Sequence, residues 1–144
     1  MERLGRQLWF TWKLVYDRLE LQLNRAGGSV SQWVVLKVVA HEPGLAHRDL
    51  AERMGLSRPT LTHHLDRMEA DGLITRTRDT ADRRVVRVHL TPEGKQRLVE
   101  LEAVVERFDA GLRALLPERE VASLHRSLTR LHGRLADEGG PRGS

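Results

Sequence analysis

The chain has 144 residues, of which 40% are hydrophobic and 31% charged, and its formal net charge is +4. This length suits one compact body with appendages, and no apolar run approaches the roughly 20 residues that a membrane-spanning helix needs. The absence of cysteine excludes disulfides, thiolate redox switches and cysteine-ligated zinc. Because the first residues also lack the apolar core and cleavage site of a secretion signal, we expect a cytoplasmic protein.

The first predicted element is a long amphipathic helix over about residues 2–24. Its apolar side chains recur at steps of three and four, which places them on one face of a helix. They are Leu4, Leu8, Trp12, Val15, Leu19 and Leu23. Ala26, Gly27 and Gly28 are expected to end the helix.

Two shorter helices are predicted next. Ser31 is a suitable N-cap for a helix that contains Trp33, Leu36 and Ala40 and stops near Pro43 and Gly44. A third helix, over about residues 47–54, is closed by Gly55.

The fourth helix is predicted to begin at Ser57, a good N-cap, with Pro59 in the first turn, where a missing amide hydrogen costs little. Its buried stripe is expected to contain Leu61, Leu65 and Met68.

A β-hairpin is predicted after Gly72, because residues 73–78 and 84–90 are rich in Val, Ile and Thr and are separated by the turn-forming residues 79–83. Residues 76–89 hold five arginines against two aspartates, a local excess of +3. This hairpin therefore predicts an anion-facing surface.

The last part of the chain predicts two helices separated near Pro117, the first capped by Thr91. Their apolar side chains follow alternating steps of three and four, and seams this regular need apolar partners. The first seam contains Leu98, Leu101, Val105, Phe108, Leu112 and Leu115, and the second Val121, Leu124, Leu128, Leu131 and Leu135. Residues 137–144 contain three glycines and a proline, and we expect them to be disordered.

The order helix, short turn over residues 55–57, helix and hairpin is that of a helix-turn-helix followed by a wing. In such a unit the outer face of the second helix enters the major groove of DNA. Ser57, Arg58 and Thr60 can then reach phosphates, and Thr62 and His63 are expected to approach base edges. Arg67 can reach either a base or a phosphate. When this helix is considered without the turn and the hairpin, the alternative interpretation is a surface helix whose polar face only contacts solvent.

These segments resemble the multiple antibiotic resistance regulator (MarR) family over about residues 31–98. The matching motifs are LAER at 50–53, LSRPTLT at 56–62, LDRME at 65–69, GLI at 72–74, DRR at 82–84 and LTPEG at 90–94. The resemblance implies a mainly α fold with a small β-hairpin wing. It implies an N-terminal dimerisation helix in residues 1–30, a winged helix-turn-helix in 31–91 and C-terminal dimerisation helices in 92–136, before the tail 137–144.

The resemblance also implies roles for the DRR motif. Arg84 would be the tip arginine that enters the minor groove, where a guanidinium meets concentrated negative potential. Asp82 would hold the shape of the wing, and Arg83 lies between them. The alternative is a surface ion pair without function. Two positions depart from the family's pattern: His63 stands where many relatives carry arginine, and Ala46 or His47 where they often have a Ser or Thr cap.

By the same resemblance, the chain is expected to be a homodimeric, sequence-specific repressor that reads an inverted-repeat operator and blocks a promoter. Half-sites would lie about 10 base pairs apart. Relatives often bind a small aromatic or phenolic acid between the dimerisation helices and the DNA-binding part, and such a ligand is expected to release this chain from DNA. The candidate residues for the site are Trp9, Trp12, Trp33 and His41. Tryptophans that simply belong to the core are the alternative.

Other classes of protein have less support in the sequence. It lacks a phosphate-binding glycine loop, a nucleophile elbow and an HExxH motif, so we expect no enzyme and no cofactor. The seven histidines are scattered, and no metal site is predicted. An architectural DNA protein and a helical protein-binding module stay open as alternatives.

Overall fold

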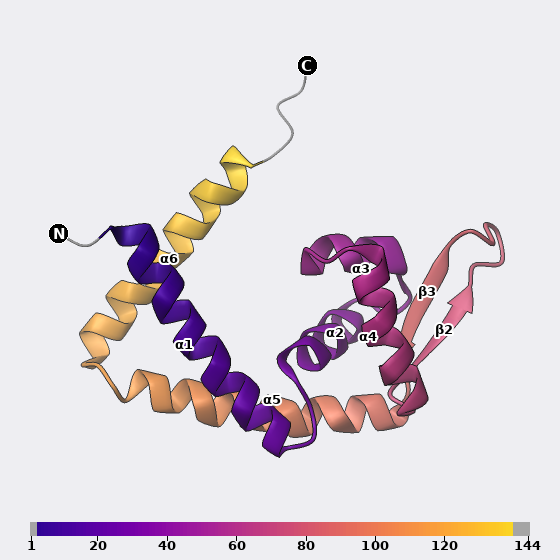
Figure 1. Cartoon of the computed structure of the whole chain (residues 1–144), viewed down its shortest axis with the longest axis horizontal. Helices are drawn as coiled ribbons and strands as arrows, with labels where there is room; N and C mark the ends of the chain where they lie inside the picture. The colour runs from indigo at the N-terminus through magenta and orange to yellow at the C-terminus, as the bar shows by residue number, and fades with distance from the viewer. Residues whose placement is uncertain (1–2, 140–144) are drawn as a thin grey trace. The chain divides into compact units, whose positions relative to one another are not determined.

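The computed structural model describes residues 3–139 and contains six helices and three strands within that range (Figure 1). The elements are α1 (Leu4–Arg25), α2 (Val30–His41), β1 (Leu45–Ala46), α3 (His47–Met54), α4 (Arg58–Ala70), β2 (Ile74–Arg78), β3 (Val86–Leu90), α5 (Pro92–Arg113) and α6 (Glu118–Glu138). The chain divides into two compact units, Met1–Glu106 and Arg107–Ser144. Among the described helices, none combines the length and the apolar character that crossing a membrane requires.

The sheet of the first unit has three antiparallel strands in the order β1-β3-β2. The hairpin β2–β3 agrees with the sequence prediction, although its strands begin later, at Ile74 and Val86. The third strand, β1, pairs Leu45 with Val88 and Ala46 with Arg87. This strand was not predicted from the sequence, because two residues are too few to show a periodic pattern.

Helix α2 begins two residues earlier than predicted, and its N-cap is Ser29 rather than Ser31. Ser29 has an extended backbone, and its hydroxyl accepts a hydrogen bond from the Gln32 amide at 3.0 Å. This backbone conformation is the one that an N-cap requires, whereas Ser31 already lies inside the first turn. The Val30 amide at the same end donates to the Glu20 carboxylate of α1 at 2.8 Å.

The turn between α3 and α4 depends on Gly55 and Ser57. Gly55 lies in the left-handed region, with φ of 65°, and the Leu56 amide donates to the Ala51 carbonyl at 3.0 Å. A glycine adopts this conformation without the steric cost that other residues incur. Helix α4 then starts from Ser57, as the sequence predicts.

The core of the first unit lies beneath α4 and confirms the predicted stripe, since Leu61, Leu65 and Met68 are all buried. Each of the elements α1 to α5 contributes to this core. The fully buried side chains include Leu23, Leu36, Leu50, Ile74, Val88 and Leu101. Because α4 is packed along this stripe, its opposite face is presented to solvent.

The LTPEG motif joins the sheet to α5. The Thr91 hydroxyl donates to the Gly72 carbonyl at 2.5 Å and accepts from the Gly94 amide at 3.0 Å, so Thr91 caps α5 as predicted. A Cβ atom on Gly94 would lie 2.0 Å from the Leu73 carbonyl oxygen. Only glycine allows this approach, which explains why the motif ends in that residue.

The second unit contains the end of α5 and the helix α6. Helix α6 continues to Glu138, two residues beyond the predicted end of the C-terminal helices, and residues 140–144 of the predicted tail lie outside the described residues. No α6 residue is buried in the described chain. Its apolar seam is present as predicted, and Leu124, Leu128 and Leu135 are between 43% and 59% exposed.

Candidate nucleic-acid interface

The start of α4 presents short polar side chains. The Ser57 hydroxyl accepts from the Thr60 amide at 3.3 Å and lies 2.8 Å from the Thr60 hydroxyl. Both residues are exposed, as is Arg58. The helix terminus therefore leaves polar groups and a cation accessible where an anion is electrostatically favoured.

Thr62 is less available than the sequence analysis expected. Its side chain is half-buried, and its hydroxyl donates to the Arg58 carbonyl at 2.9 Å and lies 3.2 Å from the His47 Nε2 atom. Thr62 therefore connects α4 to α3. The contact was invisible in the sequence because the two residues are 15 positions apart.

His63 and Arg67 are exposed on α4, whereas His64 is half-buried. The two neighbouring imidazole rings have centroids 6.2 Å apart. His64 and Arg67 also line a polar cavity of about 370 Å³, together with Glu20 and Asp71. The exposed polar face of α4 thus begins at Ser57 and continues through His63 to Arg67.

Arg76 connects α4 to the sheet through ion pairs. Its guanidinium on β2 binds Glu69 at 2.5 Å and Asp66 at 2.6 Å, both on α4. From the sequence, Arg76 was only one of the arginines of the basic hairpin, and this role was not predicted. Two ion pairs from one planar guanidinium fix the direction of α4 relative to the sheet.

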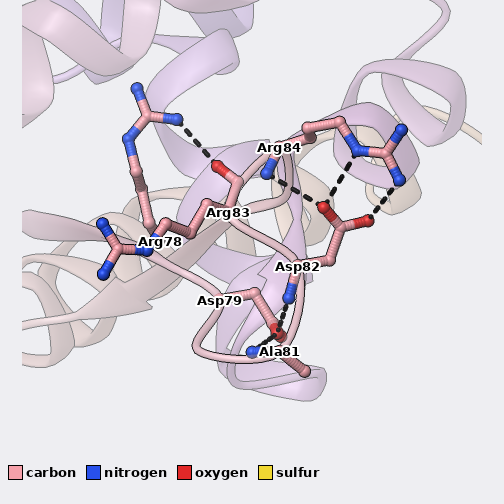
Figure 2. A network of polar contacts seen from close by, with 6 residues as sticks. All are labelled: Arg78, Asp79, Ala81, Asp82, Arg83 and Arg84. Carbon is pink, nitrogen blue, oxygen red and sulfur yellow. Dashed lines mark hydrogen bonds and ion pairs between the residues drawn. The ribbon is translucent and has the colours of Figure 1, made fainter.

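The wing carries Arg84 at an accessible position (Figure 2). Its guanidinium contacts both carboxylate oxygens of Asp82, at 3.0 and 3.2 Å, and its amide donates to the same side chain at 3.1 Å. The Arg84 side chain is nevertheless 91% exposed. Asp82 therefore orients a cation that stays free to meet an anion in solvent.

Asp79 organises the rest of the wing loop. Its carboxylate accepts from the amides of Ala81 and Asp82, at 2.8 and 3.0 Å, as Figure 2 shows. It also accepts from Arg87 on β3 at 2.6 Å, and Arg87 donates in turn to the Gly44 carbonyl. A structural role in the wing was predicted for Asp82 alone. An aspartate that opens a tight loop was the available signal, because it can bond to amides two or three residues ahead.

The bond from Arg87, with the two loop amides, lowers the pKa of Asp79 from 3.8 to about 2. A depressed carboxyl pKa stabilises the folded wing above pH 4, and this contribution is lost as the pH falls from about 4 toward 2.

We predict that Arg87→Leu raises the pKa of Asp79 toward 3.8, which a carboxyl-carbon NMR titration measures directly. Arg113→Leu removes an exposed ion pair to Asp109 and serves as the control. A midpoint near 4 in the unmodified protein contradicts the assignment.

A cationic groove lies between α3, α4 and the wing, with a volume of about 630 Å³. Its lining includes Ala46, Val85 and Val86 beside the polar residues that matter here, which are His47, Arg48, Arg58, Arg76, Asp82 and Arg84. Four of the charged lining residues are arginines and one is an aspartate, and the carboxylates that pair with Arg76 and Arg48 lie outside the lining. The lining itself therefore carries more positive than negative charge, which suits a phosphate.

The four candidate effector residues have separate surroundings. Trp9 packs against Phe10 with ring centroids 5.1 Å apart, and Trp12 against Tyr16 at 5.4 Å. Trp9 and Trp12 are each 55% exposed, and His41 is exposed. Trp33 is half-buried beside the core, with the Lys37 ammonium 5.5 Å from its ring. None of these ring contacts joins two of the four candidates.

Within residues 3–139, no group of three or more His, Asp or Glu side chains is arranged to hold a metal.

Comparison with known proteins places this geometry among transcriptional regulators. The model of the MarR family matches residues 29–86. A putative transcriptional regulatory protein for the hcr operon of Thauera aromatica is 36% identical over 98 residues, which are 68% of this chain and 59% of that protein. The HTH-type transcriptional regulator YsmB of Bacillus subtilis is 31% identical over 109 residues, 76% of this chain and 75% of that protein. The chain spans about three fifths of the length of the first curated relatives.

Solved structures share the fold. The transcriptional repressor CouR, bound to a 23-mer DNA duplex, aligns with a TM-score of 0.84 and 27% identity, covering 90% of this chain and 92% of that one. The PcaV regulator of Streptomyces coelicolor, in complex with its natural ligand, aligns with a TM-score of 0.69 and 28% identity, covering 90% and 89%. The fold of this chain is thus shared with these transcriptional regulators over about nine tenths of its length.

Proposed function

The chain belongs to the MarR family of transcriptional regulators, and on that premise we propose that it is a dimeric repressor which binds an inverted-repeat operator. The observation that carries the proposal is the groove between α4 and the wing, where arginines from both elements line one surface. Its relatives are named as regulators, which indicates DNA binding rather than catalysis. A DNA target also favours a cytoplasmic location.

The proposed contacts follow from exposure and charge. Helix α4 enters the major groove, with Ser57, Arg58 and Thr60 at phosphates and with His63 and Arg67 facing bases. Thr62 stays in this surface, but its hydroxyl has less hydrogen-bonding capacity left than the sequence implied. The wing contacts the minor groove through Arg84, which Asp82 orients and Arg83 accompanies.

A second copy of the chain is the proposed partner for the terminal helices. In α1, Leu4 is 65% exposed. In α6, the apolar seam has no buried member in the described chain. Apolar seams with a heptad-like period are stable only when another apolar surface covers them. Residues 1–30 and 92–136 would then form the dimerisation part, and residues 31–91 the reading head.

An effector is a further part of the proposal. The PcaV structure contains that protein's natural ligand, and a relative in Escherichia coli, 41% identical over 64 residues, is named as the homoprotocatechuate degradative operon repressor. We extend this to a small aromatic acid that releases DNA from the present chain. Trp9, Trp12, Trp33 and His41 stay the candidates for its recognition.

The salt dependence of DNA binding tests the proposed function. Affinity for a duplex recovered by selection from a random library should fall steeply with added salt, because each phosphate contact releases counterions. That duplex should also bind roughly 10³-fold or more tightly than a scrambled one. Steep salt dependence with no sequence preference would indicate an architectural protein instead, and no DNA binding at low salt would indicate a protein-binding module.

A further inference from the structure

His47, the first residue of α3, lies at the groove but has no place in the contacts assigned so far. Its side chain is half-buried and lines the groove together with Arg58 of α4 and Arg84 of the wing. Its Nε2 atom lies 3.2 Å from the Thr62 hydroxyl oxygen. His47 therefore contacts α4 and also lines the groove in which the proposed function places a DNA backbone.

The hydrogen bonds of Thr62 determine which nitrogen of His47 holds a proton. The Thr62 hydroxyl has one hydrogen, which it donates to the Arg58 carbonyl. Its oxygen must then accept from His47, so the neutral imidazole has its hydrogen on Nε2. Nδ1 consequently has no hydrogen to donate unless the ring takes up a second proton.

Partial burial and the charges around His47 favour the neutral form of the ring in the free protein. Arg48 and Asp49 are its neighbours on α3, Arg58 lies on α4 and Arg76 on β2. The carboxylates that face this region from other elements are engaged by arginines, Asp66 and Glu69 by Arg76 and Asp82 by Arg84. Partial burial, with Arg76 and Arg58 nearby, lowers the pKa of His47 below 6.5.

We propose that His47 is a further DNA contact, which binds a backbone phosphate in this groove and takes up one proton from solvent when the duplex binds. The inference rests on the proposed function, because it assumes that DNA occupies the groove. A phosphate beside the ring favours the imidazolium, and the new Nδ1 hydrogen can bond to a phosphate oxygen. The Nε2 bond to Thr62 is kept, so α4 stays in place as the charge appears.

Proton uptake sets the sign of the pH dependence. A group whose pKa is higher in the complex than in the free protein strengthens binding at low pH, and this gain is lost as the pH rises through the pKa of the complex. Each unit of difference between the two pKa values changes affinity by about tenfold. We therefore expect affinity to fall by about tenfold or more between pH 6 and pH 8.

The test measures affinity at pH 6, 7 and 8 and constant ionic strength, by fluorescence anisotropy, with the duplex recovered by selection. Calorimetry of the same binding reaction in two buffers of different ionisation enthalpy counts the protons taken up. His47→Gln retains a donor for Thr62 but cannot ionise, and its affinity should not vary with pH. His47→Lys is always charged, and at pH 8 it should bind about as tightly as the unmodified protein does at pH 6.

His64→Gln is the matched control, because it removes another imidazole of α4 that is half-buried and is not among the proposed DNA contacts. This variant should retain the pH dependence. The inference is overturned if the unmodified protein binds equally well at pH 6 and pH 8, if the dependence survives in His47→Gln, or if it disappears in His64→Gln. Absence of binding to any duplex at every pH would instead overturn the proposed function.

Discussion

Replacing Arg84 with alanine is expected to weaken operator binding by about 1 to 3 kcal/mol, which is roughly a 5- to 150-fold loss of affinity. Arg84 is 91% exposed, and Asp82 holds its guanidinium at two points. The side chain is thus oriented before DNA arrives, so little conformational entropy is lost when it enters a narrow minor groove. Fluorescence anisotropy with the selected duplex measures the effect.

Folding should be unaffected by this change, because the side-chain bonds of Arg84 go only to an exposed carboxylate on the same loop. Thermal unfolding of the Arg84→Ala variant checks this point. Arg126→Ala on α6 is the matched control, since it removes one arginine of the second unit. An unchanged affinity in Arg84→Ala, or an equal loss in Arg126→Ala, would count against the role assigned to the wing.

Replacing Leu128 with aspartate is expected to convert the dimer to monomers. Leu128 lies within the α6 seam and is 43% exposed in the single chain. Full burial of an exposed leucine contributes about 1.5 to 3 kcal/mol, and 43% of Leu128 remains to be covered, so each copy contributes roughly 0.6 to 1.3 kcal/mol to the dimer. The loss of about 1.3 to 2.6 kcal/mol from the two copies corresponds to a rise in the dimer dissociation constant of roughly 10- to 100-fold. A carboxylate placed in an apolar seam adds a desolvation cost in the same direction.

Sedimentation measures the monomer–dimer equilibrium, and operator affinity should fall with it, because each monomer can contact only one half-site. Thr129→Asp introduces the same charge at the next residue, about 100° around the helix from Leu128, and should leave the dimer intact. A Leu128→Asp protein that stays dimeric would show that this seam does not form the interface. A circular dichroism spectrum typical of a folded helical protein in both variants would exclude unfolding as the cause of the lost dimer.

The sequence was sufficient where a structural rule acts over a few neighbouring residues. The spacing of Leu61, Leu65 and Met68 predicted the buried side of α4, and Ser57 with Pro59 predicted its start. Both follow from the geometry of one helix. The hairpin was predictable for the same reason, since its strands follow each other in the chain and are rich in β-branched residues.

The sequence was insufficient where the contact joins distant segments. Arg87 donates to Gly44, 43 positions away, and no periodic pattern connects them. The His47–Thr62 contact and the ion pairs of Arg76 likewise depend on the packing of α3 and β2 against α4. The prediction of Ser31 as the N-cap of α2 was wrong by two residues. Both Ser29 and Ser31 satisfy the sequence rule, and only the backbone conformation distinguishes them.

The most direct measurement combines selection of bound duplexes from a random library with the mass of the resulting complex in solution. A dimer with two winged helix-turn-helix units predicts that the recovered duplexes contain an inverted repeat, with half-sites about 10 base pairs apart from centre to centre. It also predicts two chains on each duplex. A recovered sequence without a repeat, or a complex with one chain per duplex, would contradict the account.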